Sequence, residues 1–271
     1  MPAVNLLNLR KEITSLLWEF TDPESFRDKL AQLLDHYRIM SFRSGSGVLT
    51  SYQTPELHVP QLVLHELELA LYQTIREQPQ AALTLCDSLW NDVNLEMHTI
   101  ATRMLGQIPI EYIDQVLTRI NEWTQKGLKP SELKVFFRNA AGLIRQKQPE
   151  KLMRSAQDWC AEPDNKNRER GIQLLIYLVE DPAFINLPAV YTALEKMLPD
   201  ADAVLQPDLT ELIGLLLSRS EIETSFFVRQ MLENPDSGKI IRRIARKLLP
   251  KIPESSRESI QNLLRTSQKE N

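Results

Sequence analysis

The sequence repeats itself every 36 residues, and this period limits the chain to folds built by stacking copies of one small element pair. Asp92, Asp164 and Asp236 lie 72 residues apart, and Asp200 falls midway between the last two. We call these positions the marks of the repeats, and Leu128 occupies the mark of the one repeat that lacks the Asp. Apolar side chains stand eight residues after four of the five marks, at Ile100, Phe136, Ile172 and Ile244. In the remaining repeat the register slips by one residue, so that Asp208 precedes the apolar Leu209.

Each repeat reads as two amphipathic helices joined by a turn at the marked position. Apolar residues recur at spacings of three and four, as in Ile241, Ile244, Ala245 and Leu248, and strand alternation is nowhere sustained. The pattern predicts five helical pairs between about residues 79 and 250. The expected fold class is therefore all-α, a right-handed α-α superhelix of HEAT-like helical repeats.

The ends of the chain depart from the period but remain helical in pattern. Residues 1–48 are expected to form an N-terminal hairpin of two helices, Leu6–Phe20 and Asp22–Met40, followed by the polar segment Ser41–Thr54. Residues 49–250 hold the repeats, and residues 251–271 hold a cap helix over 254–266 and a tail. We expect one continuous domain over 1–271.

The marked aspartates are explained by helix capping alone. An Asp before a helix accepts backbone N–H groups and lies at the positive end of the helix dipole. We therefore expect Asp92, Asp164, Asp200 and Asp236 to begin second helices and assign them no other role.

Composition favours a helical protein, and we expect it to be cytoplasmic and monomeric. Charged residues make up 25% of the chain and Gly is scarce at 8 residues, which suits helices. No apolar run reaches the roughly 20 residues of a membrane span, and the first residues lack the pattern of a secretion signal. Cys86 and Cys160 follow no metal-binding spacing and are expected to be buried thiols.

The usual signatures of metal and nucleophilic chemistry are missing from the sequence. His36, His58, His65 and His98 are scattered, and His65-Glu66 is not followed by the second His of a helical zinc site. No Ser lies in a nucleophile-elbow context and neither Cys has a local activating partner. We expect no metal and no cofactor.

Charge is distributed in alternating blocks, which the net charge of −4 conceals. Residues 49–128 hold four bases and ten acids, and residues 180–236 hold three bases and eleven acids. Residues 129–177 hold ten bases and six acids, and residues 238–271 hold nine bases and three acids. Localised basic blocks in an acidic chain are the pattern expected of a nucleic-acid-binding surface.

The basic residues fall into three clusters on separate repeats. A helix expected over 131–146 would bring Arg138 and Arg145 onto one face. The remaining members continue along the following repeats: Lys147, Lys151, Arg154, Lys166, Arg168, Arg170, Lys239, Arg242, Arg243, Arg246, Lys247 and Lys251. Equivalent positions of stacked repeats share one surface, so these clusters would form a track for duplex DNA. The alternative interpretation is that they are ordinary solvated helix faces.

Residues 85–101 place Leu89-Trp90 before an acidic helix, and residues 158–172 contain Trp159 and Arg170. These two segments resemble an earlier and a later segment of the DNA alkylation-repair glycosylases built from HEAT-like repeats. Residues 52–60 also resemble the family's approach to its second helical pair, so the resemblance covers about residues 50–250. It implies duplex DNA bound in a basic concave groove and excision of positively charged alkylated purines by Trp and Asp side chains.

The sequence departs from the family where catalysis would occur. Residues 131–138 read Ser-Glu-Leu-Lys-Val-Phe-Phe-Arg, with neither Trp nor Asp, and Glu132 is the only carboxylate that could take the role. Asn167 and Arg168 stand where a second aromatic residue is expected. A carboxylate is needed to stabilise the cationic sugar, and aromatic faces hold a cationic base.

We therefore expect a DNA-binding HEAT-like protein with weak or no glycosylase activity. Its predicted DNA contacts are Arg138, Arg145, Lys147, Lys151, Trp159, Arg168, Arg170, Arg242, Arg243, Arg246 and Lys247. The alternative is a protein-binding scaffold without a nucleic-acid role, favoured by the acidic repeats.

Overall fold

A computed structural model describes residues 4–38, 57–234 and 238–266. Within these ranges every regular element is a helix and no strand occurs, which confirms the all-α prediction. No helix in the described ranges is both long enough and apolar enough to cross a membrane. The predicted polar segment Ser41–Thr54 lies outside the described residues.

The helices group into two compact units, whose boundary falls inside the predicted 49–250 array. Unit 1 comprises residues 1–122 and 138–143, and unit 2 comprises residues 123–137 and 144–271. The helices that lie wholly in unit 1 are α1 (Leu6–Leu17), α2 (Pro23–His36), α3 (Gln61–Glu77), α4 (Pro79–Trp90), α5 (Leu95–Leu105) and the short 3₁₀ helix η1 (Ile110–Tyr112). Helices α6 (Ile113–Thr124), α7 (Pro130–Ala140) and α8 (Gly142–Lys147) contain residues of both units.

Unit 2 contains the remaining helices. They are α9 (Pro149–Ala161), α10 (Asn165–Val179), α11 (Leu187–Met197), η2 (Leu198–Asp200), η3 (Ala203–Leu205), α12 (Gln206–Arg219), α13 (Glu221–Glu233), α14 (Gly238–Leu248), η4 (Leu249–Lys251) and α15 (Glu254–Thr266).

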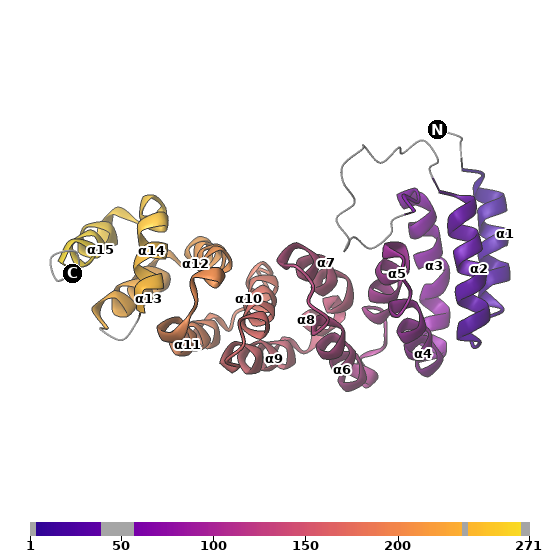
Figure 1. Ribbon diagram of the computed structural model, residues 1–271, viewed down its shortest axis with the longest axis horizontal. Coiled ribbons are helices and arrows are strands. Elements are labelled where there is room, and N and C mark those ends of the chain that lie inside the picture. Colours follow the sequence, from indigo (N-terminus) through magenta and orange to yellow (C-terminus); the bar gives the residue numbers. More distant parts are fainter. Residues whose placement is uncertain (1–3, 39–56, 235–237, 267–271) are drawn as a thin grey trace. The chain divides into compact units, whose positions relative to one another are not determined.

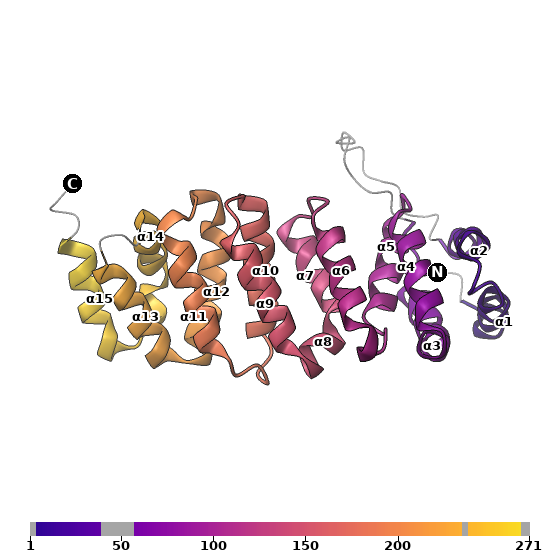
Figure 2. The same cartoon turned by 90° about the horizontal axis from the view of Figure 1, so that it is seen from below.

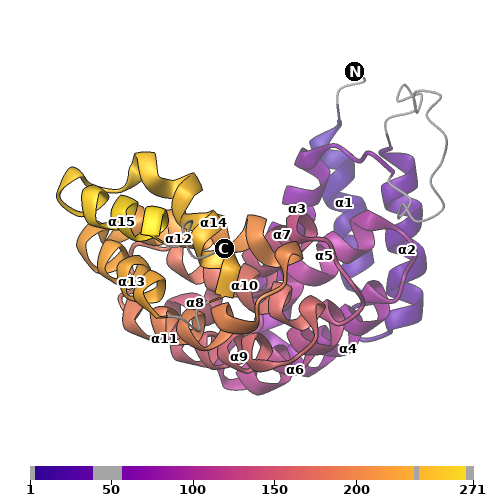
Figure 3. The ribbon, with the colours of Figure 1, turned by 60° about the vertical axis from the view of Figure 1, so that its left-hand side comes forward.

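Each unit has two layers of helices with an apolar core between them. In unit 2, α10, α12 and α14 form one layer, and α9 packs on α11 in the other (Figure 1). In unit 1, α1, α3 and α5 pack side by side, and α2 packs on α4 in the second layer (Figure 3). Helices α11, α13 and α15 lie on the same side of unit 2 (Figure 2), and α13 packs against α12, α14 and α15. Burying an apolar stripe against neighbours on both sides is what makes such helices stable together.

The period predicted the helical pairs correctly. Two successive helices flank each mark along the chain: α4 and α5, α6 and α7, α9 and α10, α11 and α12, and α13 and α14. Ile100, Phe136, Ile172, Leu209 and Ile244 are all buried, including the residue at the slipped register. The N-terminal hairpin and the 254–266 cap helix are also confirmed, as α1, α2 and α15.

The marked aspartates serve different local roles. Asp164 is the N-cap of α10 and its carboxylate accepts the backbone N–H groups of Lys166 and Asn167, as predicted. Asp92 instead accepts the backbone N–H of Asn94, which is itself the residue before α5. Asp200 ends η2, and Asp202 caps the following η3, so the prediction was wrong for Asp200. Asp236 lies outside the described residues.

The helix expected over residues 131–146 is interrupted. Helix α7 ends at Ala140 and α8 begins at Gly142, so Arg138 and Arg145 do not share a helix. The break falls at Ala141, directly before Gly142. Glycine is costly in a helix interior, so a helix is easily interrupted at this point.

Both cysteines are buried free thiols, as predicted. Burial raises the pKa of Cys86 well above its ordinary range and raises that of Cys160 to about 12. Neither is suited to act as a thiolate.

Candidate functional site: a polar pocket and a basic helix face

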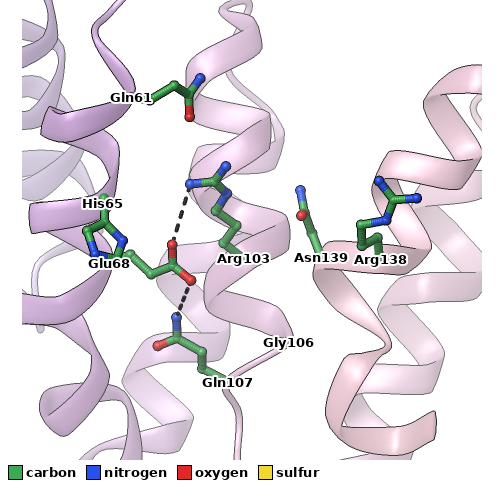
Figure 4. A pocket seen from close by; sticks show the side chains of 8 residues that line it. All are labelled: Gln61, His65, Glu68, Arg103, Gly106, Gln107, Arg138 and Asn139. Atoms are coloured by element: carbon green, nitrogen blue, oxygen red, sulfur yellow. Dashed lines mark hydrogen bonds and ion pairs between the residues drawn. The ribbon is translucent and has the colours of Figure 1, made fainter.

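Unit 1 contains an open polar pocket of about 590 Å³ between α3, α5 and the end of α7 (Figure 4). Its lining residues come from all three helices: Gln61, His65, Glu68, Arg103, Gly106, Gln107, Arg138 and Asn139. Of these, only Arg138 belongs to the predicted DNA-binding residues.

Glu68 organises one wall of the pocket. It accepts hydrogen bonds from Arg103 Nη1 at 3.4 Å and from Gln107 Nε2 at 3.3 Å. The ion pair neutralises one carboxylate, so Arg138 leaves the pocket with an excess of positive charge. The side-chain oxygen of Gln107 is buried and has no hydrogen-bond partner among the described residues, so a donor group of a ligand or a water would satisfy it.

A glycine fixes the position of Arg138 and Asn139 beside this wall. A Cβ atom at Gly106 would lie 1.9 Å from the backbone oxygen of Asn139, so the end of α5 and the end of α7 approach backbone to backbone. Asn139 Nδ2 also donates to Thr102 Oγ1 on α5 at 3.3 Å. Arg138 remains exposed, and none of the described residues forms an ion pair with it.

The pocket could have been found from the repeat. Arg103 and Asn139 are one period of 36 residues apart, and Glu68 precedes Arg103 by 35 residues. Polar residues one period apart fall at matching positions on neighbouring second helices. Sequence reasoning missed them because it compared only apolar positions and basic clusters.

Arg145 in unit 2 is engaged in the protein's own structure. Its guanidinium lies 4.2 Å from the ring centroid of Tyr177, donates to the Tyr177 carbonyl at 3.1 Å, and pairs with Asp181 at 3.2 Å. Arg145, a predicted DNA contact, is therefore paired within the protein, because the carboxylate 36 residues further along the chain neutralises its charge.

Trp159 and Arg170 form a buried stacked pair. The Arg170 guanidinium lies 4.2 Å from the centre of the Trp159 ring, and Arg170 and Trp159 are only 4% and 8% exposed. Arg170 also donates to Thr124 Oγ1 at 3.1 Å and to the side-chain oxygen of Asn167. Burial lowers the pKa of Arg170. These two residues are core residues in this structure, a correction to their assignment as DNA contacts.

The other predicted residues near this pair have local roles or lie apart from it. Arg168 donates to the backbone carbonyls of Glu162 and Asp200, and so joins the start of α10 to η2. Glu132 accepts the backbone N–H of Lys129 at 2.7 Å and thereby caps α7. Lys147 is exposed at the end of α8, and Lys151 is half-buried on α9.

Acidic residues on α10 and α12 interrupt the predicted basic track. Burial and the nearby Asp208 raise the pKa of Glu169. Burial, followed by the charge of Glu211, raises the pKa of Asp208. The side-chain amide of Gln173 lies near the Asp208 carboxyl and opposes this rise in pKa. The distance and angle between the two groups do not meet the criteria for a hydrogen bond. Helix α12 packs between α10 and α14, and its one base, Arg219, donates to backbone carbonyls. No free base of α12 therefore connects the basic residues of α10 with those of α14.

Helix α14 carries the basic cluster that remains free. Ile240, Ile241, Ile244, Ala245 and Leu248 are buried on one face. The opposite face carries bases that are exposed or half-buried, and within the described part of the chain none of them forms an ion pair: Lys239, Arg242, Arg243, Arg246 and Lys247. This arrangement confirms the predicted positions of Arg242, Arg243, Arg246 and Lys247 opposite the apolar stripe.

Comparison with known protein families, characterised proteins and solved structures finds no match for this chain. In the described ranges no group of three or more His, Cys, Asp or Glu side chains is placed to hold a metal ion. The pocket of unit 1 and the basic face of α14 offer cationic groups for an anion.

Proposed function

We propose that the protein binds the phosphate backbone of duplex DNA through the basic face of α14. The observation that carries this proposal is the row of five bases without carboxylate partners among the described residues. Arg242 with Arg246, and Arg243 with Lys247, are one turn apart, and long flexible side chains at that spacing suit a regularly charged polyanion. Cations left without internal partners are the groups that gain most from meeting phosphates.

We also propose a HEAT-like right-handed superhelix as the framework and the unit 1 pocket as a second cationic site. Arg138 has no ion pair among the described residues, so its guanidinium group suits a phosphate. We propose weak or no glycosylase activity, since Glu132 caps a helix and Trp159 is buried by Arg170.

The test is binding of a labelled duplex of about 20 base pairs at several salt concentrations. The triple variant Arg242→Gln/Arg243→Gln/Arg246→Gln should bind more weakly. The slope of log K against log salt should become less negative by about 0.9 for each phosphate that is no longer neutralised. Lys11→Gln/Arg27→Gln/Lys196→Gln is the control, because it removes the same number of positive charges from exposed or half-buried positions outside α14.

Absence of binding at low salt, binding that ignores salt, or equal losses in the two triple variants would refute the α14 assignment. Release of 7-methylguanine from methylated duplex DNA separately measures glycosylase activity. Substantial release would contradict the expectation of weak or no excision.

A second candidate function, a protein-binding scaffold, is favoured by one specific observation. Helices α11 and α13 present an apolar groove on the surface of unit 2, and its composition is unsuited to binding phosphates.

A further inference from the structure

The surface of unit 2 carries an apolar groove of about 420 Å³ between α11 and α13. Figure 2 shows these two helices on the same side of the unit. Pro188, Tyr191, Thr192 and Glu195 contribute from α11, and the α13 residues are Ile222, Glu223, Phe226, Phe227 and Gln230.

Contacts between α11 and α13 hold the side chains at the floor of the groove in place. The rings of Tyr191 and Phe227 are 5.2 Å apart, and the Tyr191 hydroxyl is 2.8 Å from Thr224 Oγ1. Thr224 is fully buried and donates in turn to the Ser220 carbonyl. A preorganised floor loses little entropy when a ligand docks.

The wall formed by α13 is apolar and exposed. Ile222 is 83% exposed and Phe226 is 56% exposed, and they lie one turn apart on the same helix face. An aromatic and a branched aliphatic side chain held in solvent beside a groove are typical anchors for a partner.

The rim of the groove is negatively charged. Glu195 and Glu223 line it, and neither forms an ion pair with a described residue. Glu223 lines the same groove as Tyr191. Burial raises the pKa of Tyr191, and the charge of Glu223 adds to this shift, while the hydrogen bond with Thr224 opposes it. Arg229 stacks on Phe226 but is paired with Glu233, so it does not cancel the rim charge.

We propose that this groove docks a basic amphipathic helix of a partner protein. Apolar residues on one face of that helix would cover Ile222 and Phe226, and its flanking Lys or Arg residues would meet Glu195 and Glu223. A second copy of this chain fits worse, because a symmetric contact would bring the two glutamate rims together. This inference does not rest on DNA binding.

The test uses the full chain and labelled helical peptides of about 18 residues, followed by fluorescence anisotropy. A Leu/Lys amphipathic peptide should bind, and peptides with the same pattern in Leu/Glu or Ser/Lys should not. The double variant Ile222→Ser/Phe226→Ser should weaken binding by about tenfold or more, as expected for loss of anchor residues. Glu195→Gln/Glu223→Gln should weaken binding several-fold and reduce its dependence on salt.

Val204→Ser is the matched control, because Val204 is a 60% exposed apolar residue outside the groove and should leave binding unchanged. Circular dichroism confirms that each variant is folded, and duplex binding by Ile222→Ser/Phe226→Ser should equal that of the parent. Binding of the Ser/Lys or Leu/Glu peptide as tight as that of Leu/Lys would overturn the proposal. Peptide binding by Ile222→Ser/Phe226→Ser that equals binding by Val204→Ser would also overturn it. A dimer of the parent in sedimentation that Ile222→Ser/Phe226→Ser alone dissociates would do the same.

Discussion

Two arginines of this protein, Arg170 and Arg243, differ in burial and in hydrogen bonding. Arg170 is buried against Trp159 and bonded to Thr124 and Asn167, whereas Arg243 is exposed and forms no ion pair with a described residue. A buried guanidinium contributes to packing and internal hydrogen bonds, and an exposed one contributes to the electrostatic field. The two residues should therefore respond differently to the same substitution.

Arg170→Ala should lower the free energy of unfolding by about 2–4 kcal/mol, because it leaves a cavity beside Trp159 and removes the donors to Thr124 and Asn167. Arg243→Ala should change stability by no more than about 0.5 kcal/mol and weaken duplex binding. Urea denaturation and duplex titration of both variants provide the check. A stable Arg170→Ala protein would show that the pair is not structural.

Asp208 should make stability depend on pH. Its pKa is raised from the ordinary 3.8, mainly by burial, so ionisation is disfavoured in the folded state. Its favourable contribution is complete below 3.8 and is lost as pH rises through the higher folded-state pKa. Asp208→Asn should therefore stabilise the protein at neutral pH, by less than about 1 kcal/mol because solvent screens this half-buried group.

Urea denaturation at about pH 7 and about pH 4.5 tests this prediction. The advantage of Asp208→Asn should shrink at the lower pH, where more of the native carboxyl is protonated. Asp158→Asn, at an exposed position on α9, is the control and should show no such change. A variant less stable than the parent at neutral pH would contradict the sign.

At the scale of elements, close contact between helices constrains the sequence more than helix propensity does. Gly106 ends α5 against the backbone of α7. Gly214 lies inside α12, where a Cβ atom would meet only a side-chain carbon, Leu248 Cδ2, at 3.6 Å. Gly106 is therefore required because a side chain there would overlap the α7 backbone, whereas Gly214 has room for a methyl group.

Gly106→Ala should destabilise the protein by about 2 kcal/mol or more, because the new methyl group would overlap the Asn139 carbonyl and displace the end of α7. Gly214→Ala should be neutral or stabilising by up to about 1 kcal/mol, since alanine is the better helix former. Thermal denaturation of both variants distinguishes contact from propensity. Equal effects would mean that the α5–α7 approach is looser than the structure shows.

Over the whole molecule, each compact unit carries one buried thiol that can report on its opening. Cys86 belongs to unit 1 and Cys160 to unit 2, and burial raises the pKa of both. Reactivity requires the thiolate and access to solvent. Labelling of each cysteine should therefore follow unfolding of its own unit.

Pulsed alkylation with mass spectrometry across a urea gradient measures both sites in the unmodified chain. Neither thiol should label appreciably in native buffer, and both should label fully after unfolding. Different midpoints for Cys86 and Cys160 would show that the units open separately. Rapid native labelling of either residue would contradict its burial.

The 36-residue period by itself determined the all-helical class, the five pairs, the buried residue of each repeat and the two faces of α14, because each depends on residues within one or two turns. Tertiary structure alone decided which bases are free. Arg145 meets the Tyr177 carbonyl 32 residues away and Arg170 meets Thr124 46 residues away, and the pocket joins α3, α5 and α7. Periodicity shows which face of a helix is apolar, but the carboxylate or carbonyl that meets a given guanidinium depends on packing between helices.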